Sequence, residues 1–148
     1  MNRPTLVEHL SPNPPKRILA LDGGGVRGIL TLGYLARIES VLRDRYGDPD
    51  LRLCDYFDLI GGTSTGAIIA TGLAIGKIVA QLQELYRKLA NDIFKAEWYR
   101  LGLLSPKFSI EALQTALEDT FHDYRLGGKE VLTGLMIMCT RFDTGSPG

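Results

Sequence analysis

Residues 17–30, RILALDGGGVRGIL, join a short apolar run and an aspartate to a glycine-rich turn that leads back into apolar sequence. The run at 17–21 is typical of a buried strand, and a loop so poor in side chains brings backbone N–H groups close to an anion. The anion could be a dinucleotide pyrophosphate or an oxyanion formed during a reaction. Gly23, Gly25 and Gly28 satisfy G-x-G-x-x-G after a strand and before a helix, which is the context of the dinucleotide fingerprint.

The dinucleotide fingerprint has a second requirement, an acidic residue about 20 positions further on that binds the ribose at the end of the second strand. Asp44 stands at about that distance, but in a segment with helical periodicity. The next predicted strand begins only at residue 56 and ends in GGTSTG. Dinucleotide binding therefore rests on the glycine loop alone and stays open as one interpretation.

The second loop, Gly62-Thr63-Ser64-Thr65-Gly66, is a G-x-S-x-G sequence between a predicted strand and a predicted helix. This context indicates a nucleophile elbow, in which glycines two positions either side of the serine let strand and helix approach. The Ser64 hydroxyl would then project at a helix N-terminus, where the helix dipole favours developing negative charge. The alternative is a turn that only caps the helix.

The two loops lie at the carboxyl ends of strands, where the sites of parallel sheets are found. If the strands are neighbours, Ser64 faces the amides of the first loop, and such N–H donors stabilise the oxyanion of acyl transfer. Arg27, a cation in a first helical turn, is opposed by the dipole. It therefore predicts a nearby anion or carboxylate, with a solvent-facing arginine as the alternative. The predicted oxyanion loop comprises Gly23, Gly24, Gly25, Val26, Arg27 and Gly28.

The whole chain predicts an α/β fold, a parallel-type sheet flanked by helices. We expect strands at 17–21, 56–62 and 131–140, the last also buried, and helices at 28–47, 63–76, 77–90 and from an N-cap at Ser109 to 121. The segment 91–107, with Trp98 and Tyr99, reads as irregular. Three strands are few for a sheet, so we expect the domain to be incomplete at its C-terminal end.

The composition is that of a soluble globular domain, with 45% apolar and 23% charged residues among 148. Basic and acidic residues balance at 17 each and form no basic stripe, which argues against nucleic acid as a partner. No segment is apolar for the roughly 18 residues of a membrane span. The proline-rich residues 1–16 read as a flexible lead-in to a domain at 17–148. Cys54 and Cys139, isolated and predicted to be buried, suit a reducing compartment, so we expect a cytoplasmic protein.

With LDGGGVRG followed by DLIGGTSTGAIIA, the sequence resembles the patatin-like phospholipases, and the likeness extends more loosely through SPKFSIEALQTALEDTF to RFDTGS. The resemblance implies hydrolysis of acyl esters of phospholipids and other lipids by a Ser–Asp dyad, without metal or cofactor. It implies Ser64 as the nucleophile and amides around Gly24 and Gly25 as the oxyanion hole, with Arg27 close by. Lipid esters are the expected substrates, with transient contact to a membrane surface. The sequence carries no signal for an oligomeric state.

The chain departs from the family at the dyad aspartate, which the resemblance places in a D-G-G or D-G-A motif well downstream of the elbow. Asp22 belongs to the oxyanion loop, and Asp143 is followed by threonine. His122, at a predicted helix end, is the alternative base, and His9 lies in the lead-in. We therefore expect the aspartate to lie outside these 148 residues and this chain alone to hydrolyse esters poorly or not at all. A non-catalytic lipid-binding domain remains a further alternative.

Overall fold

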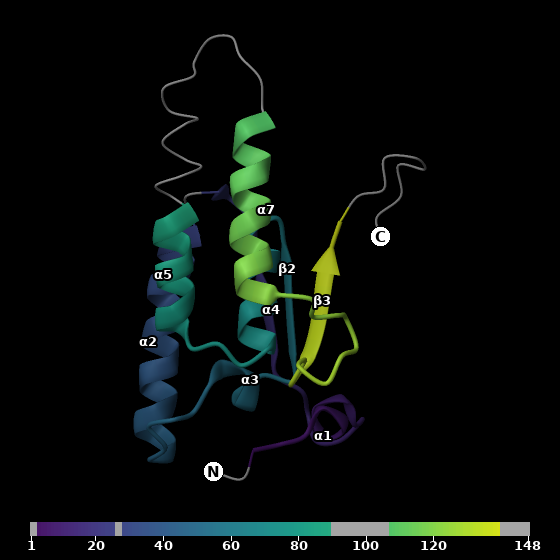
Figure 1. Cartoon of the computed structure of the whole chain (residues 1–148). Helices are drawn as coiled ribbons and strands as arrows, with labels where there is room; N and C mark the ends of the chain where they lie inside the picture. The colour runs from purple at the N-terminus through teal and green to yellow at the C-terminus, as the bar shows by residue number, and fades with distance from the viewer. Residues whose placement is uncertain (1–2, 26–27, 90–106, 140–148) are drawn as a thin grey trace.

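The sheet of this protein contains three parallel strands in the order β1-β2-β3. A computed structural model describes residues 3–25, 28–89 and 107–139 (Figure 1). The strands are β1 (Ile18–Leu21), β2 (Leu59–Thr63) and β3 (Gly134–Met138). Because all three run the same way, their C-terminal ends share one edge of the sheet.

Helices connect and cover the strands. They are α1 (Leu6–Leu10), α2 (Gly28–Tyr46), α3 (Leu53–Tyr56), α4 (Thr65–Ala74), α5 (Val79–Leu89) and α7 (Lys107–Phe121). Figure 1 shows α1 and α3 at the edge where the strands begin. Helix α4 packs on all three strands, and α5 packs on α2 and α7. The predicted α/β fold with a parallel sheet is confirmed.

The core lies between the sheet and helices α2, α4 and α5. Its completely buried side chains include Leu32, Ile60, Leu73 and Leu82. Every residue of α4 is buried or half-buried, as its nearly uniform apolar sequence predicts. Helix α2 ends at Tyr46, and Gly47 has a φ of +61°, the left-handed conformation that favours glycine after a helix.

The second strand is shorter than the sequence predicts. Tyr56 closes the short helix α3 instead of opening a strand, and β2 starts at Leu59. The cause is a capping arrangement: the Asp55 carboxylate accepts hydrogen bonds from the Arg52 backbone N–H at 2.9 Å and from its guanidinium at 2.8 Å. These contacts stabilise a helical turn just before the strand.

Three other predictions near the C-terminal half are wrong. β3 is not a buried strand, because it is an outermost strand of the described sheet and its Met136, Ile137 and Met138 are 39–43% exposed. Cys139, directly after it, is exposed, whereas Cys54 is buried as predicted. Helix α7 begins at Lys107, so Ser109 lies in its first turn and is not its N-cap. The irregular segment with Trp98 and Tyr99 lies outside the described residues.

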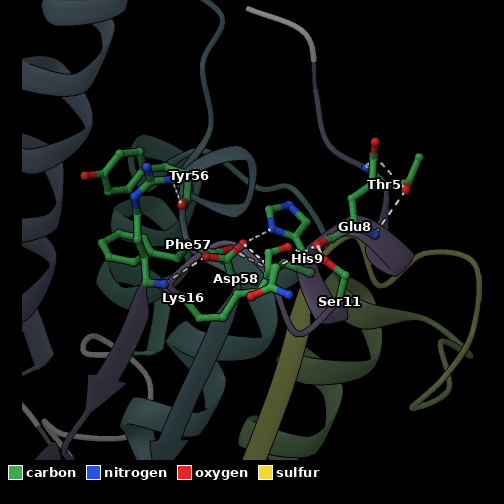
Figure 2. Close-up of polar contacts among 11 residues, drawn as sticks. Thr5, Glu8, His9, Ser11, Lys16, Tyr56, Phe57 and Asp58 are labelled. Atoms are coloured by element: carbon green, nitrogen blue, oxygen red, sulfur yellow. Dashed lines mark hydrogen bonds and ion pairs between the residues drawn. The ribbon is translucent and has the colours of Figure 1, made fainter.

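The N-terminal residues contain the helix α1 (Leu6–Leu10), although their proline-rich sequence predicts a flexible lead-in. Its His9 is 3% exposed, and the ring Nδ1 lies 2.9 Å from Asp58 Oδ1, just ahead of β2 (Figure 2). The other Asp58 oxygen accepts the Arg17 backbone N–H at 2.8 Å, and Lys16 Nζ lies 3.9 Å from Oδ1. Asp58 thus joins α1, the start of β1 and the start of β2 at one edge of the sheet.

No helix within residues 3–25, 28–89 and 107–139 combines the length and the apolar character that crossing a bilayer requires.

Candidate active site

Ser64 occupies the turn between β2 and α4 in a conformation that side chains rarely adopt. Its φ is +51° and its ψ is −127°, and its side chain is exposed. Left-handed backbone at a non-glycine residue is strained and persists only where the surrounding structure enforces it. Here the strand and the helix enforce it, and they hold the hydroxyl out at the carboxyl edge of the sheet.

The glycines on either side of Ser64 are required by backbone crowding. A Cβ at Gly62 would lie 2.5 Å from the carbonyl carbon and oxygen of Gly66 and 2.7 Å from Ala67 N. A Cβ at Gly66 would meet the carbonyl oxygens of Leu21 and Asp22, the second at 2.7 Å. These contacts involve main chain that cannot swing aside. They explain why glycine stands two positions before and two positions after Ser64. They also show that the end of β1 limits the space at Gly66.

The glycine-rich loop after β1 lies directly against the elbow. β1 and β2 are paired, with Leu21 opposite Gly62, so the segments that follow them leave the sheet side by side. A Cβ at Gly23 would lie 2.7 Å from Ser64 Cβ and 3.4 Å from Ser64 Oγ. The structure therefore brings together the two loops that the sequence motifs place in one site.

Two amides of the glycine loop are already hydrogen-bonded to the elbow. Gly23 N–H donates to Thr63 Oγ1 at 3.0 Å, and Gly24 N–H donates to Thr65 Oγ1 at 3.3 Å. Gly25 has a φ of +55°, which glycine adopts without strain. None of the hydrogen bonds among the described residues uses the Gly25 N–H. Val26 and Arg27, also predicted for the oxyanion loop, lie outside the described residues.

Tyr86 on α5 is part of this site, although no motif in the sequence marks it as a site residue. Its hydroxyl donates to the Gly25 carbonyl oxygen at 2.9 Å. A Cβ at Gly28 would collide with that hydroxyl, so Gly28 leaves room for Tyr86. Burial raises the pKa of the Tyr86 hydroxyl, and a hydrogen bond with the Thr65 side chain partly opposes this. A tyrosine among the leucines of a buried helix face is the sequence feature that could have indicated this role, because a buried tyrosine hydroxyl needs a hydrogen-bond partner.

The described histidines do not stand next to Ser64. His9 is bonded to Asp58 at the edge where the strands begin, opposite the carboxyl edge (Figure 2). His122 is exposed, directly follows α7 and packs edge-on against Tyr124, with ring centroids 5.8 Å apart. In Figure 1, α7 ends toward the edge where β3 begins. Ser64 Oγ has no hydrogen-bond partner among the described residues, so the described structure gives no support to His122 as its base.

Asp44, the candidate ribose-binding acid, is also remote from the loops. It lies near the C-terminal end of α2, about four helical turns from Gly28. β2 ends in the elbow and carries no acidic residue there. The arrangement does not support a dinucleotide site at the glycine loop.

A hollow of about 520 Å³ lies between α5 and α7, away from these loops. Its walls are formed by Lys77, Gln81, Glu84, Leu85, Lys88, Thr115, Ala116, Asp119 and Thr120. None of these residues belongs to the elbow or to the glycine loop.

Comparison with known proteins identifies the family to which this chain belongs. The family profile described as Patatin-like phospholipase matches residues 19–145, which include both motifs, β2, β3 and all of β1 except Ile18. The chain belongs to the patatin-like phospholipase family. This patatin-like chain is 35% identical over 144 residues to a cGAMP-activated phospholipase of Escherichia coli (strain TW11681), covering 90% of this chain and 38% of that protein.

Two further relatives show the range of the similarity. A cGAMP-activated phospholipase of Vibrio cholerae is 45% identical over 96 residues, 60% of this chain and 27% of that protein. Patatin-17 of Solanum cardiophyllum is 33% identical over 137 residues, 88% of this chain and 34% of that protein. The patatin-like chain therefore spans between about a quarter and two fifths of the length of these curated relatives.

Proposed function

We propose that this patatin-like chain carries the nucleophile and the oxyanion loop of a lipid acyl hydrolase, with Ser64 as the nucleophile. The observation that supports this most directly is the contact of Gly23 with Ser64 at a positive-φ elbow. A backbone forced into this conformation presents a hydroxyl to a loop of amides at the N-terminus of α4. Family membership supports carboxylic esters of phospholipids or other lipids as substrates.

In the proposed reaction, Ser64 Oγ attacks the ester carbonyl carbon while its proton passes to a base. The carbonyl oxygen becomes an oxyanion, which is stabilised by N–H groups of the glycine loop that are not already bonded to Thr63 and Thr65, the Gly25 N–H among them. A single such donor contributes roughly 3–4 kcal/mol to the transition state. The C–O bond to the alcohol then breaks, the alcohol leaves with a proton, and an acyl-serine remains. Water attacks this ester by the same route and releases the fatty acid.

The described residues supply the nucleophile and the glycine loop of the proposed site, but they do not supply the base. A serine hydroxyl is a weak nucleophile unless an adjacent group accepts its proton. No carboxylate or imidazole among the described residues hydrogen-bonds Ser64 Oγ. We therefore propose that the base is the dyad aspartate that the family uses, which residues 1–148 do not supply, and that these residues alone hydrolyse esters weakly or not at all.

Covalent labelling tests this proposal. A fluorophosphonate should modify Ser64 in the complete gene product, and Ser64→Ala should abolish both labelling and hydrolysis of a short-chain p-nitrophenyl ester. Alanine keeps the Cβ that the elbow already accommodates, so an unchanged melting temperature separates loss of the nucleophile from loss of the fold. Turnover that survives in Ser64→Ala would overturn the assignment of Ser64 as the nucleophile. Ser64-dependent turnover by residues 1–148 alone would overturn the assignment of the base.

The proposal includes contact of the site with a lipid surface. Helix α2 starts at the end of the glycine loop, and three large apolar side chains in its first turns are exposed: Ile29 at 49%, Leu30 at 65% and Tyr34 at 75%. Apolar and aromatic residues of this kind enter the boundary between headgroups and acyl chains. The same proposal places the protein in the cytoplasm, which the free thiol of Cys54 supports.

Sedimentation with phosphatidylcholine vesicles tests the lipid contact. Leu30→Ser together with Tyr34→Ser should lower the partition coefficient about tenfold, because apolar area leaves the bilayer boundary. The matched control is Val7→Ser, since Val7 is 78% exposed on α1 at the opposite edge of the sheet. Equal binding of all three proteins would contradict a role for α2.

A further inference from the structure

The threonines on either side of Ser64 make equivalent contacts with the glycine loop. Thr63 Oγ1 accepts the Gly23 N–H and Thr65 Oγ1 accepts the Gly24 N–H, at 3.0 and 3.3 Å. Two consecutive amides of one loop are thus fixed by the residues directly before and after the candidate nucleophile. The loop is tied to the elbow through hydroxyl groups that have no role in the nucleophile motif itself.

Tyr86 fixes the next residue of the same loop from a third element. Its ring is 2% exposed within the core, and its hydroxyl bonds the Gly25 carbonyl oxygen at 2.9 Å. The hydroxyl also interacts with Thr65. Gly23, Gly24 and Gly25 are therefore each anchored by one side-chain hydroxyl, and the anchors come from β2, α4 and α5.

This anchoring matters because glycines do not hold a loop in one conformation by themselves. Three consecutive glycines have more backbone freedom than any other tripeptide. Oxyanion donors are effective only when they are oriented before the reaction, so that no reorganisation is needed in the transition state. A loop of this composition needs external contacts to be oriented, and these three hydroxyls provide them.

We propose that Thr63, Thr65 and Tyr86 are positioning residues that hold residues 23–25 against Ser64 in the geometry that binds the acyl oxyanion. The inference rests on the proposed function, since it assigns these hydroxyls a role in the same reaction. It also explains the crowding at Gly28, which admits the Tyr86 hydroxyl to the loop. The hydroxyls act through the loop and do not touch the substrate.

Single-hydroxyl deletions in the complete gene product provide the test. Thr65→Val and Tyr86→Phe remove one hydroxyl each and keep the shape of the side chain. We expect each to lower kcat for a short-chain p-nitrophenyl ester about 10-fold or more with KM nearly unchanged, and to slow fluorophosphonate labelling of Ser64 in parallel. Thr65→Ser, which retains the hydroxyl, should restore most of the rate.

Matched controls remove hydroxyls that do not contact the glycine loop. Thr71→Val removes a hydroxyl in α4 that bonds Ala67 O of its own helix, and Tyr124→Phe removes an exposed one on the connection from α7 to β3. Both should keep wild-type kcat. A fall in melting temperature without a change in kcat would show a merely structural role and overturn the inference. A rise in kcat would also overturn it, because the hydroxyls would then hold the loop away from the substrate.

The wild-type and Ser64→Ala proteins separate this inference from the proposed function. If wild type is labelled and Ser64→Ala is not, while Thr65→Val and Tyr86→Phe react at the wild-type rate, the positioning role fails and the hydrolase assignment stands. If wild type neither reacts with the fluorophosphonate nor hydrolyses the ester, the proposed function fails and the positioning role fails with it.

Discussion

Gly23 and Ser64, 41 positions apart in sequence, are in contact at the carboxyl edge of the sheet, where a methyl group on Gly23 would lie 2.7 Å from Ser64 Cβ. The contact follows from the pairing of β1 with β2, which directs both loops to the same side. The space between the two loops accommodates glycine at position 23 and no larger residue.

Gly23→Ala is therefore expected to displace the loop from the elbow. Misplacement of a catalytic group by about 1 Å costs on the order of 100-fold in rate, and we expect a similar loss in the rate of fluorophosphonate labelling. The control is Gly33→Ala, where a Cβ meets nothing within 4 Å on the exposed face of α2. That variant should label normally and gain roughly 0.5–1 kcal/mol of stability. Normal labelling of Gly23→Ala would contradict the close contact.

Gly62→Ala should act on the fold as well as on the site. The new methyl group would press on the backbone of Gly66, and neither β2 nor α4 can yield without loss of packing. We expect a loss of about 3 kcal/mol in the free energy of unfolding, at the upper end of overpacking effects, measured by urea denaturation. A variant as stable as the wild type would show that the elbow tolerates a wider turn.

Gly72 and Leu82 set how closely α4 and α5 approach. A Cβ at Gly72 would collide with Leu82 Cδ2, and Leu82 is 1% exposed and has no open space to enter. Gly72→Ala is expected to destabilise the protein by about 1–2 kcal/mol despite the better helix propensity of alanine. In the double variant with Leu82→Ala, the total loss of stability should be smaller than the sum of the losses in the two single variants. Additive losses in urea denaturation would exclude the contact as the cause.

Asp58 should make stability depend on pH in the acid range. Burial raises the pKa of its carboxyl, but the Arg17 N–H, the His9 ring and the Lys16 charge outweigh burial and lower it from its ordinary 3.8. The unfolded chain then binds protons first as the pH falls, so the contribution of Asp58 is full above about pH 3.8 and is lost below it. Asp58→Asn should cost roughly 1–3 kcal/mol at pH 7.

Urea denaturation at several pH values measures this effect. The difference in unfolding free energy between the wild type and Asp58→Asn should narrow as the pH falls below about 3.8. Asp123→Asn, which changes an exposed carboxylate on the connection from α7 to β3, is the control. A difference that stays constant down to pH 2 would show that the charge of Asp58 is not what stabilises α1 and the strand starts.

Local patterns determined much of the fold and the outline of the site. The apolar run before the glycines, the helical spacing of α2 and α5 and the G-x-S-x-G turn are all short-range signals, and the structure places a strand, two helices and an elbow there. Periodicity reports which face is buried. It failed for β3, because burial of a strand depends on the elements around it, and for Tyr56, because a capping interaction of Arg52 with Asp55 competes with the strand.

By itself, the sequence determined that a glycine loop and a serine elbow follow strands of one α/β domain of the patatin-like family. Only the tertiary structure decided what lies between them. The Thr63 and Thr65 hydroxyls occupy the amides of Gly23 and Gly24, and Tyr86 reaches Gly25 from a helix 61 positions away. No periodicity or motif encodes such contacts, because they depend on the register of β1 with β2 and on the packing of α5 against α2.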